Sequence, residues 1–224
     1  AASKIRSELG CPEDDAKEVF AAVGAPEASG QAIAVAALIE KRKTRSTGDI
    51  DSVIEQLEYG PRTNPVEQAL KKLGELLGLA SSRPDREEGS GPDVKWYHDE
   101  SRTGAGIEAK TDKKETSQYQ KKDDIGQFHD HAKYLADAHP GEHFRKIIVG
   151  RELTVSKECH PPDDLQNVEL EHFRALAQKL HECYTAIIGS SDSEALEVTV
   201  QRWLDTYGLL WPDCIDSLPS VLAI

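Results

Sequence analysis

The chain has 224 residues, of which 38% are hydrophobic and 30% charged, and its mean hydropathy is −0.55. This length accommodates one full α/β core and a small accessory region. The longest apolar stretch, residues 32–39, is shorter than the ~20 apolar residues of a membrane span, so no membrane association is expected. The four cysteines are widely spaced and form no C-x-x-C pair, which argues against a zinc ribbon or a dense disulfide framework and predicts a cytoplasmic location.

Charge is distributed unevenly along the chain. The 27 basic and 40 acidic residues give a net charge of −13, yet residues 61–150 carry 15 basic and 16 acidic groups. Residues 151–224 carry 5 basic and 13 acidic groups. Proteins that bind nucleic acid usually show a basic surface, so this balance predicts weak non-specific binding and targeting by a partner or a second subunit. Several acids of the middle segment are candidate metal ligands, whose charge a bound cation would offset.

Residues 1–62 are expected to form a helical accessory region. Alanine, glutamate, glutamine and lysine dominate it, and the pattern predicts helices over residues 16–23, 30–45 and 49–59. Breaks are expected at residues 24–26 and around residues 47–48. The turn signals at Gly60–Pro61 and Asn64–Pro65 place a boundary there, and residues 63–224 form the main domain.

The main domain begins with a strongly patterned helix. Asn64 is expected to cap it, Pro65 to open it and Gly78 to end it, while an apolar stripe follows the helical period from Val66 to Leu77. The expected elements after it are strands 93–97 and 106–111 joined by a polar hairpin loop, helix 117–138, strand 144–149 with a continuation over 152–155, helix 165–180, strand 183–188, and helix 191–207 with a capping box of Ser191 and Glu194. This order predicts a mixed α/β fold around one sheet.

The chemistry of the chain is concentrated on the two strands of this hairpin. Asp93 opens the first strand, and Glu108 and Lys110 lie two residues apart on the second. Alternate residues of a strand share a face, so Glu108 and Lys110 should point together while Ala109 packs away from them. If the strands pair, Asp93 meets Glu108 at one end of the sheet. Two carboxylates suit a hard cation such as Mg²⁺, and a lysine beside it can stabilise charge on a phosphate.

Pro92–Asp93 followed by Glu108–Ala109–Lys110 resembles the motif of the PD-(D/E)XK nuclease superfamily, which has the restriction-endonuclease-like fold. The resemblance covers residues 64–155 and extends more loosely to residue 207. It implies a mixed β-sheet flanked by helices. It also implies roles for an acid on the upstream helix, here Glu67, and for a glutamine on the downstream helix, here Gln127. The segment around Gly126–Gln127 and Tyr134–Leu135 is similar to cleavage modules of restriction enzymes and bacterial defence nucleases.

The resemblance implies a metal-dependent nuclease, most simply a DNA endonuclease of restriction or defence type. Asp93, Glu108, the Ala109 carbonyl and Glu67 are the implied ligands of one or two Mg²⁺ ions, for which Mn²⁺ can substitute. Lys110 and Gln127 are implied to orient the attacking water. Cleavage of both strands of a duplex needs two such sites, so a homodimer or a paired assembly is expected.

Each candidate also has a plainer interpretation. Asp93 could be a turn residue, Glu108 and Lys110 a solvated strand face, and Glu67 a helix-capping acid. Gln127 could lie on the surface, as is expected of His129 and His131, which cannot share an ion on one helix face. A run of lysines near the motif could contact phosphates or be a solvated surface: Lys113, Lys114, Lys121 and Lys122.

Two other functions remain open at the level of the sequence. The chain could be a nuclease-like binding or scaffold module of a larger assembly. It could also be an RNA-cleaving or junction-resolving nuclease with the same fold, because a fold does not by itself determine a function.

Overall fold

The computed structural model describes residues 28–43, 45–113, 119–120, 122–151, 154–155, 159–162, 164–191 and 194–222. Within these residues the chain has an α/β fold, as expected from the order of its elements. The elements are α3 (Gly30–Arg42), α4 (Arg45–Gln56), α5 (Asn64–Leu76), β1 (Ala80–Ser82), α6 (Pro84–Glu87), β2 (Val94–His98), β3 (Thr103–Lys110), β4 (Tyr119–Gln120), α7 (Lys122–Ala138), β5 (His143–Gly150), β6 (Thr154–Val155), β7 (Leu165–Val168), α8 (Leu170–Gly189), α9 (Leu196–Thr206), α10 (Asp213–Asp216) and β8 (Val221–Leu222).

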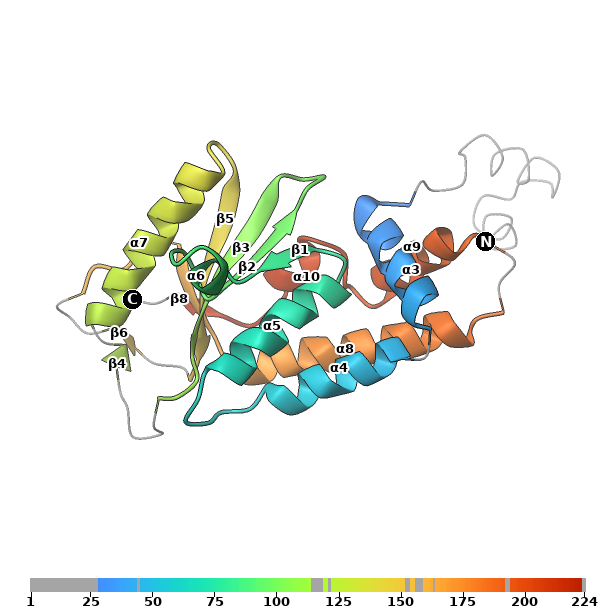
Figure 1. Cartoon of the computed structure of the whole chain (residues 1–224), viewed down its shortest axis with the longest axis horizontal. Helices are drawn as coiled ribbons and strands as arrows, with labels where there is room; N and C mark the ends of the chain where they lie inside the picture. The colour runs from blue at the N-terminus through green and yellow to red at the C-terminus, as the bar shows by residue number, and fades with distance from the viewer. Residues whose placement is uncertain are drawn as a thin grey trace, which may run out of the picture.

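A mixed six-stranded sheet in the order β1-β2-β3-β5-β7-β8 forms the centre of the fold (Figure 1). The strands β1, β2 and β3 are antiparallel neighbours, while β3, β5 and β7 run parallel and β8 returns antiparallel to β7. The predicted hairpin is therefore present, with Val94 opposite Ile107. The chain passes from β3 to its parallel neighbour β5 through α7, because parallel strands need a crossover connection.

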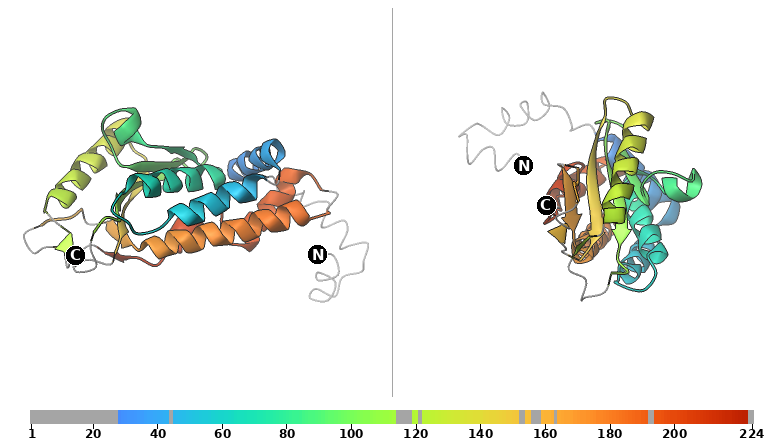
Figure 2. Two further views of the ribbon diagram at one scale, coloured as in Figure 1. Left: turned by 60° about the horizontal axis from the view of Figure 1, so that its bottom comes forward. Right: turned by 90° about the vertical axis from the view of Figure 1, so that its left-hand side faces the viewer.

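Helices cover both faces of this sheet (Figures 1 and 2). On β5, Ile147 and Val149 belong to the large buried cluster that includes α5 and α8. Ile148 between them packs instead in a second cluster with Ile125 and Phe128 of α7. Because successive side chains of a strand point to opposite faces, α7 lies across the sheet from α5 and α8.

The large cluster also includes the helices that precede residue 62. Val35 of α3 and Ile50 of α4 are fully buried in it, together with residues of α5, α8 and α9. Figure 2 shows α4, α5 and α8 lying side by side. The described part of the expected accessory region therefore contributes to the same hydrophobic core as the sheet.

The segment after residue 164 differs from the sequence-based expectation. Leu165–Val168 forms β7, and the helix that was expected from residue 165 begins at Leu170. The expected strand 183–188 is wrong, because it lies inside α8. Leu180, Cys183, Tyr184 and Ile187 are all buried at helical spacing, and a short apolar run of this kind does not distinguish a buried helix from a strand. The expected capping box is also wrong, since α9 begins at Leu196.

Smaller differences concern the ends of other helices. The break between α3 and α4 lies at Lys43, which has a positive φ of 49°, and residues 47–48 are inside α4. Asn64 begins α5, but its side chain accepts a hydrogen bond from Arg83 and caps no helix N–H group. Residues 81–90, for which the sequence pattern predicts no element, contain the end of β1 and the short helix α6. The expected helix 16–23 lies outside the described residues.

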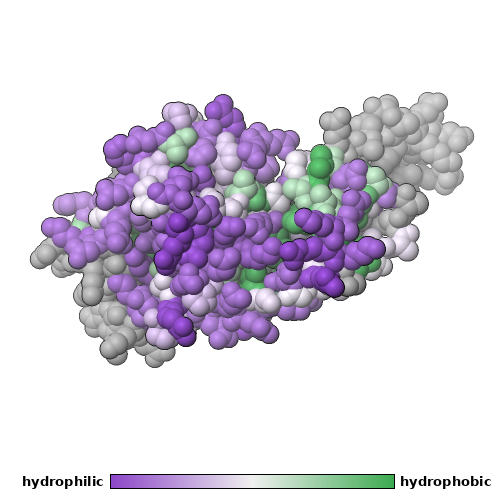
Figure 3. Space-filling model, viewed as in Figure 1, coloured by the Kyte–Doolittle hydropathy of each residue, from purple (hydrophilic) through white to green (hydrophobic). Residues whose placement is uncertain are grey.

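The surface is mostly hydrophilic over α5 and α7, and hydrophobic residues gather over α3 (Figure 3). Ile33 of α3 is the most exposed large hydrophobic side chain among the described residues, at 53%. No described helix is both long and apolar enough to cross a membrane.

The contact between α5 and β2 makes a specific packing prediction. An alanine Cβ at Gly74 of α5 would lie 2.4 Å from Nε1 of Trp96, whose indole is fully buried and donates to the carbonyl of Leu70. We therefore expect Gly74→Ala to lower the free energy of unfolding by about 1–3 kcal/mol through overpacking, measured by urea denaturation. Gly126→Ala on α7 is the matched control, because no atom lies within 4 Å of its Cβ, and it should be neutral or stabilising. Equal stability of the two variants would contradict this account.

Candidate metal centre and active site

The pairing of β2 with β3 brings the predicted site residues together. Asp93 immediately precedes β2, and its Oδ2 accepts a 2.8 Å hydrogen bond from the backbone N–H of Ala109 on β3. The ammonium of Lys110 donates to Oε1 of Glu108 at 2.8 Å. Glu108 and Lys110 thus share a face of β3, and Ala109 is buried between them, as the alternation along a strand predicts.

Glu108 is a buried carboxylate on a central strand. It is 3% exposed, and it lies opposite Ile148 on the face of the sheet that α7 covers. Burial acts to raise the pKa of Glu108, but the nearby ring of His131 and the charge of Lys110 outweigh burial and lower the pKa. The carboxylate is therefore held in its ionised form, which is the form that ligates a cation.

The second carboxylate oxygen of Glu108 faces the ring of His131. Nδ1 of His131 lies 3.1 Å from Oε2 of Glu108, which is an ion-pair distance. Neither atom makes a hydrogen bond of good geometry with a described residue, although the ring lies close enough to lower the pKa of Glu108. A buried carboxylate oxygen without a donor is costly unless something else occupies its lone pairs, and a cation can do so.

The pKa of Asp93 is shifted in the opposite direction from that of Glu108. Burial raises the pKa of Asp93 to about 7, and the charge of Glu108 adds to the rise, while the N–H of Ala109 opposes it. A cation bound between the two carboxylates would remove this repulsion. Neighbouring carboxylates that shift each other's pKa are common at functional sites.

The helix α7 contributes two side chains to this position. Oε1 of Gln127, an exposed residue, accepts a 3.0 Å hydrogen bond from the ammonium of Lys110. His131, one helical turn further on, faces Glu108 and is 17% exposed in its side chain. The expectation that His131 is a plain surface residue is therefore wrong, whereas His129 is exposed and lies next to the carbonyl of His160.

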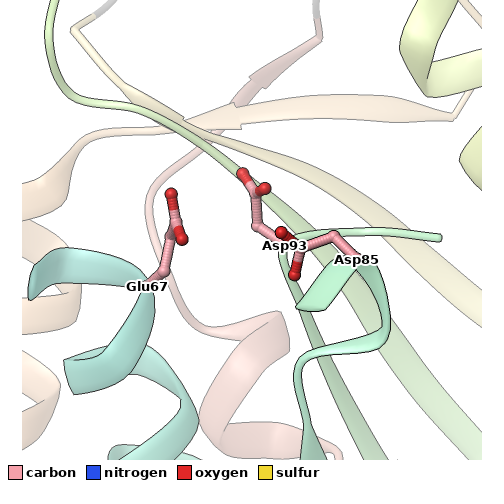
Figure 4. Close-up of side chains that lie close together, drawn as sticks. All are labelled: Glu67, Asp85 and Asp93. Carbon is pink, nitrogen blue, oxygen red and sulfur yellow. The ribbon is translucent and has the colours of Figure 1, made fainter. Parts of the chain in front are cut away.

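Glu67 comes close to the site but is already paired. It lies in the first turn of α5, is 4% exposed, and forms a buried ion pair with the guanidinium of Arg83. One carboxylate oxygen of Glu67, one of Asp85 on α6 and one of Asp93 lie within 4.8 Å of one another. Figure 4 shows these three carboxylates converging from α5, α6 and the start of β2.

The donor set fits a hard divalent cation. It offers carboxylate oxygens from Asp93 and Glu108, of which one Glu108 oxygen lacks a hydrogen bond. The N–H and C=O of one strand residue point to the same edge, so the carbonyl of Ala109 also faces Asp93. Carboxylate and carbonyl oxygens are the ligands that Mg²⁺ takes in proteins, with water completing its shell.

The lysine run is only partly described. Lys113 follows β3, and its carbonyl accepts a 3.5 Å hydrogen bond from Arg151. Lys122 is the first residue of α7 and is exposed. Lys113 therefore follows the strand that carries Lys110, and Lys122 begins the helix that carries Gln127. Lys114 and Lys121 lie outside the described residues.

Three residues at or near the site were not assigned to it from the sequence pattern. Arg83 and Asp85 lie in a polar segment that gives no periodic signal, so neither could be assigned to a site from the pattern. His131 could have been found, because it follows Gln127 by four residues and such pairs share a helix face.

Comparison of the chain with protein-family models, with curated proteins and with solved structures gives no match.

Cation binding can be measured through stability. If Asp93 and Glu108 hold Mg²⁺, then Mg²⁺ at 100 times its Kd should raise the free energy of unfolding by about 2.7 kcal/mol, and EDTA should reverse the gain. Glu108→Gln should lose most of this gain, because the amide keeps the shape of the side chain but not its charge. Glu75→Gln on α5 is the matched control, since Glu75 pairs with Lys71 and Lys72 away from the site and should keep the gain. An equal Mg²⁺ effect in both variants would rule out Glu108 as a ligand.

Proposed function

We propose that this chain is a metal-dependent nuclease with a restriction-endonuclease-like fold, which hydrolyses phosphodiester bonds of DNA. The observation that carries the proposal is the meeting of Asp93, Glu108 and Lys110 at one end of the β2–β3 pair. These residues are 17 positions apart at most in the sequence, and the pairing of β2 with β3 brings them to one end of the two strands, which supports the resemblance to the PD-(D/E)XK superfamily.

The surrounding fold supports this proposal. The helix α5 precedes the two paired strands β2 and β3, and α7 then leads to the buried strand β5. This is the order of elements that the resemblance implies. The exposed glutamine on α7 also accepts a 3.0 Å hydrogen bond from the lysine of the motif, which supports a role for it at the site.

The site residues have different roles in the proposed reaction. A divalent cation held by Asp93, Glu108 and the Ala109 carbonyl supplies Lewis acidity toward a phosphodiester and makes water more acidic. Lys110 is held between Glu108 and Gln127, so its ammonium is fixed at the site and can stabilise negative charge that develops on the phosphate. Gln127 orients Lys110, and His131 lies against Glu108 on the other side of the carboxylate.

The substrate and partners follow from charge and from the resemblance. The net charge of −13 disfavours tight non-specific binding, so targeting by a partner protein or a second copy of the chain is part of the proposal. Mg²⁺ is the proposed cofactor and Mn²⁺ its substitute, because both accept oxygen ligands. A restriction or defence role belongs to the proposal as well.

The direct test is cleavage of supercoiled plasmid and of single-stranded DNA in Mg²⁺ or Mn²⁺. We expect nicking or linearisation that EDTA abolishes and that falls by about 10²–10³-fold in Lys110→Ala, the size of effect seen when one charge-stabilising donor is removed. Lys146→Ala is the matched control, because Lys146 lies on the neighbouring strand β5, pairs with Asp164 and should keep full activity.

Two results would contradict the nuclease. One is cleavage that survives in Lys110→Ala at the wild-type rate, which would point to a contaminating enzyme. The other is the absence of cleavage of plasmid, single-stranded DNA and RNA by a protein that binds Mg²⁺, which would favour the binding or scaffold module.

A further inference from the structure

A buried guanidinium lies among the carboxylates of the site. Arg83, between β1 and α6, is 6% exposed and pairs through Nη2 with Oε2 of Glu67. Its Nη1 donates to Oδ1 of Asn64 at 2.9 Å, and its backbone N–H donates to Glu87 at 3.1 Å. An arginine side chain stays protonated in proteins, so this positive charge is permanent.

The position of this charge matters because of the acids around it. Glu67, Asp85 and Asp93 each offer one oxygen, and these oxygens lie within 4.8 Å of one another. Oδ1 of Asp85 is buried and has no hydrogen-bond partner among the described residues. Without Arg83, these carboxylates together with Glu108 would provide enough oxygen ligands for two cations.

The formal charges balance with one divalent cation. The four acids are Glu67, Asp85, Asp93 and Glu108. With all four ionised and the imidazole of His131 neutral, the two cationic side chains Arg83 and Lys110 leave two negative charges. Arg86 also reaches Asp85 at 3.4 Å, but its side chain is 62% exposed, so water screens its charge. A second divalent cation would make the site positive before any substrate bound.

We propose that the site takes one divalent cation, held by Asp93 and Glu108, and that Arg83 occupies the place beside Glu67 that a second cation would need. This inference rests on the proposed function and chooses between the one and two ions that the sequence leaves open. Glu67 is then a partner of Arg83 and not a metal ligand, which corrects the role expected for it.

Displacement of Arg83 by a second ion is disfavoured on two grounds. The incoming cation would approach a guanidinium that contacts the same carboxylate, and the two positive charges repel at close range. The freed guanidinium would lose its ionic partner while still buried, and its Nε already lacks a hydrogen-bond partner among the described residues. A buried charge without a partner is strongly unfavourable.

The experiment counts bound Mn²⁺ per chain by equilibrium dialysis and by the EPR signal of free Mn²⁺. This readout does not depend on nuclease activity. The wild-type chain should bind one ion. Glu67→Gln should also bind one ion, with a Kd within about 3-fold of the wild type, because Glu67 is not a ligand. Arg83→Met should bind two ions, and the double variant Arg83→Met with Glu67→Gln should return to one.

Two further variants keep the test informative. Arg83→Lys preserves the charge and should bind one ion. If Arg83→Met fails to fold, the ion counts of the wild-type chain and of Glu67→Gln still test the inference. Arg102→Met is the matched control, since Arg102 pairs with Glu142 on an exposed surface and its loss should leave one ion bound.

Three results would overturn the inference. Two ions bound to the wild-type chain would refute it while leaving the nuclease intact. A Kd that rises by 10-fold or more in Glu67→Gln would return Glu67 to the ligand set. No ion bound to the wild-type chain at millimolar Mn²⁺ would refute both this inference and the metal dependence of the proposed function.

Discussion

The burial of a charged residue on the central strand β3 is the constraint from which the site follows. β3 is flanked by β2 and β5 and covered by helices on both faces, so every side chain from Gly104 to Ala109 is buried. Ile107 meets the large hydrophobic core on one face, whereas Glu108 meets α7 on the other. A carboxylate in that position must have cationic partners or a bound cation, because its desolvation is otherwise uncompensated.

The partners of Glu108 explain why α7 is placed as it is. Ile125 and Phe128 anchor α7 on the sheet through the small second cluster, which fixes the rotation of the helix. Gln127 and His131 are then turned toward Lys110 and Glu108. On the same face, a Cβ at Gly106 would lie 2.6 Å from Leu135, so the glycine lets α7 approach the strand closely. The packing of α7 thus determines both its hydrophobic contact with the sheet and its polar contacts with Lys110 and Glu108.

The sequence predicts the part of the fold that depends on local patterns. The helix over residues 64–76, the hairpin, and the buried strand β5 were all predictable, because their patterns hold over many residues. The pair of Glu108 and Lys110 was also predictable from the alternation of a strand. The strand expected over residues 183–188 failed, because a short apolar run within a long buried helix carries no period of its own. β7 was missed for a related reason, since its four residues adjoin a strong helical pattern.

The relation between Glu67 and Arg83 lay beyond sequence reasoning, and it changes how the site is understood. The two residues are 16 positions apart and approach only because β1 turns the chain back along α5. The resemblance implies a metal-site role for an acid on the upstream helix, here Glu67, and the structure shows that this acid pairs with Arg83. An acid near a metal site can hold the ion or hold a cation of the protein, and only the folded geometry separates the two. Here Glu67 pairs with the buried guanidinium of Arg83, and the one divalent cation that we propose would compensate the negative charge left at the site.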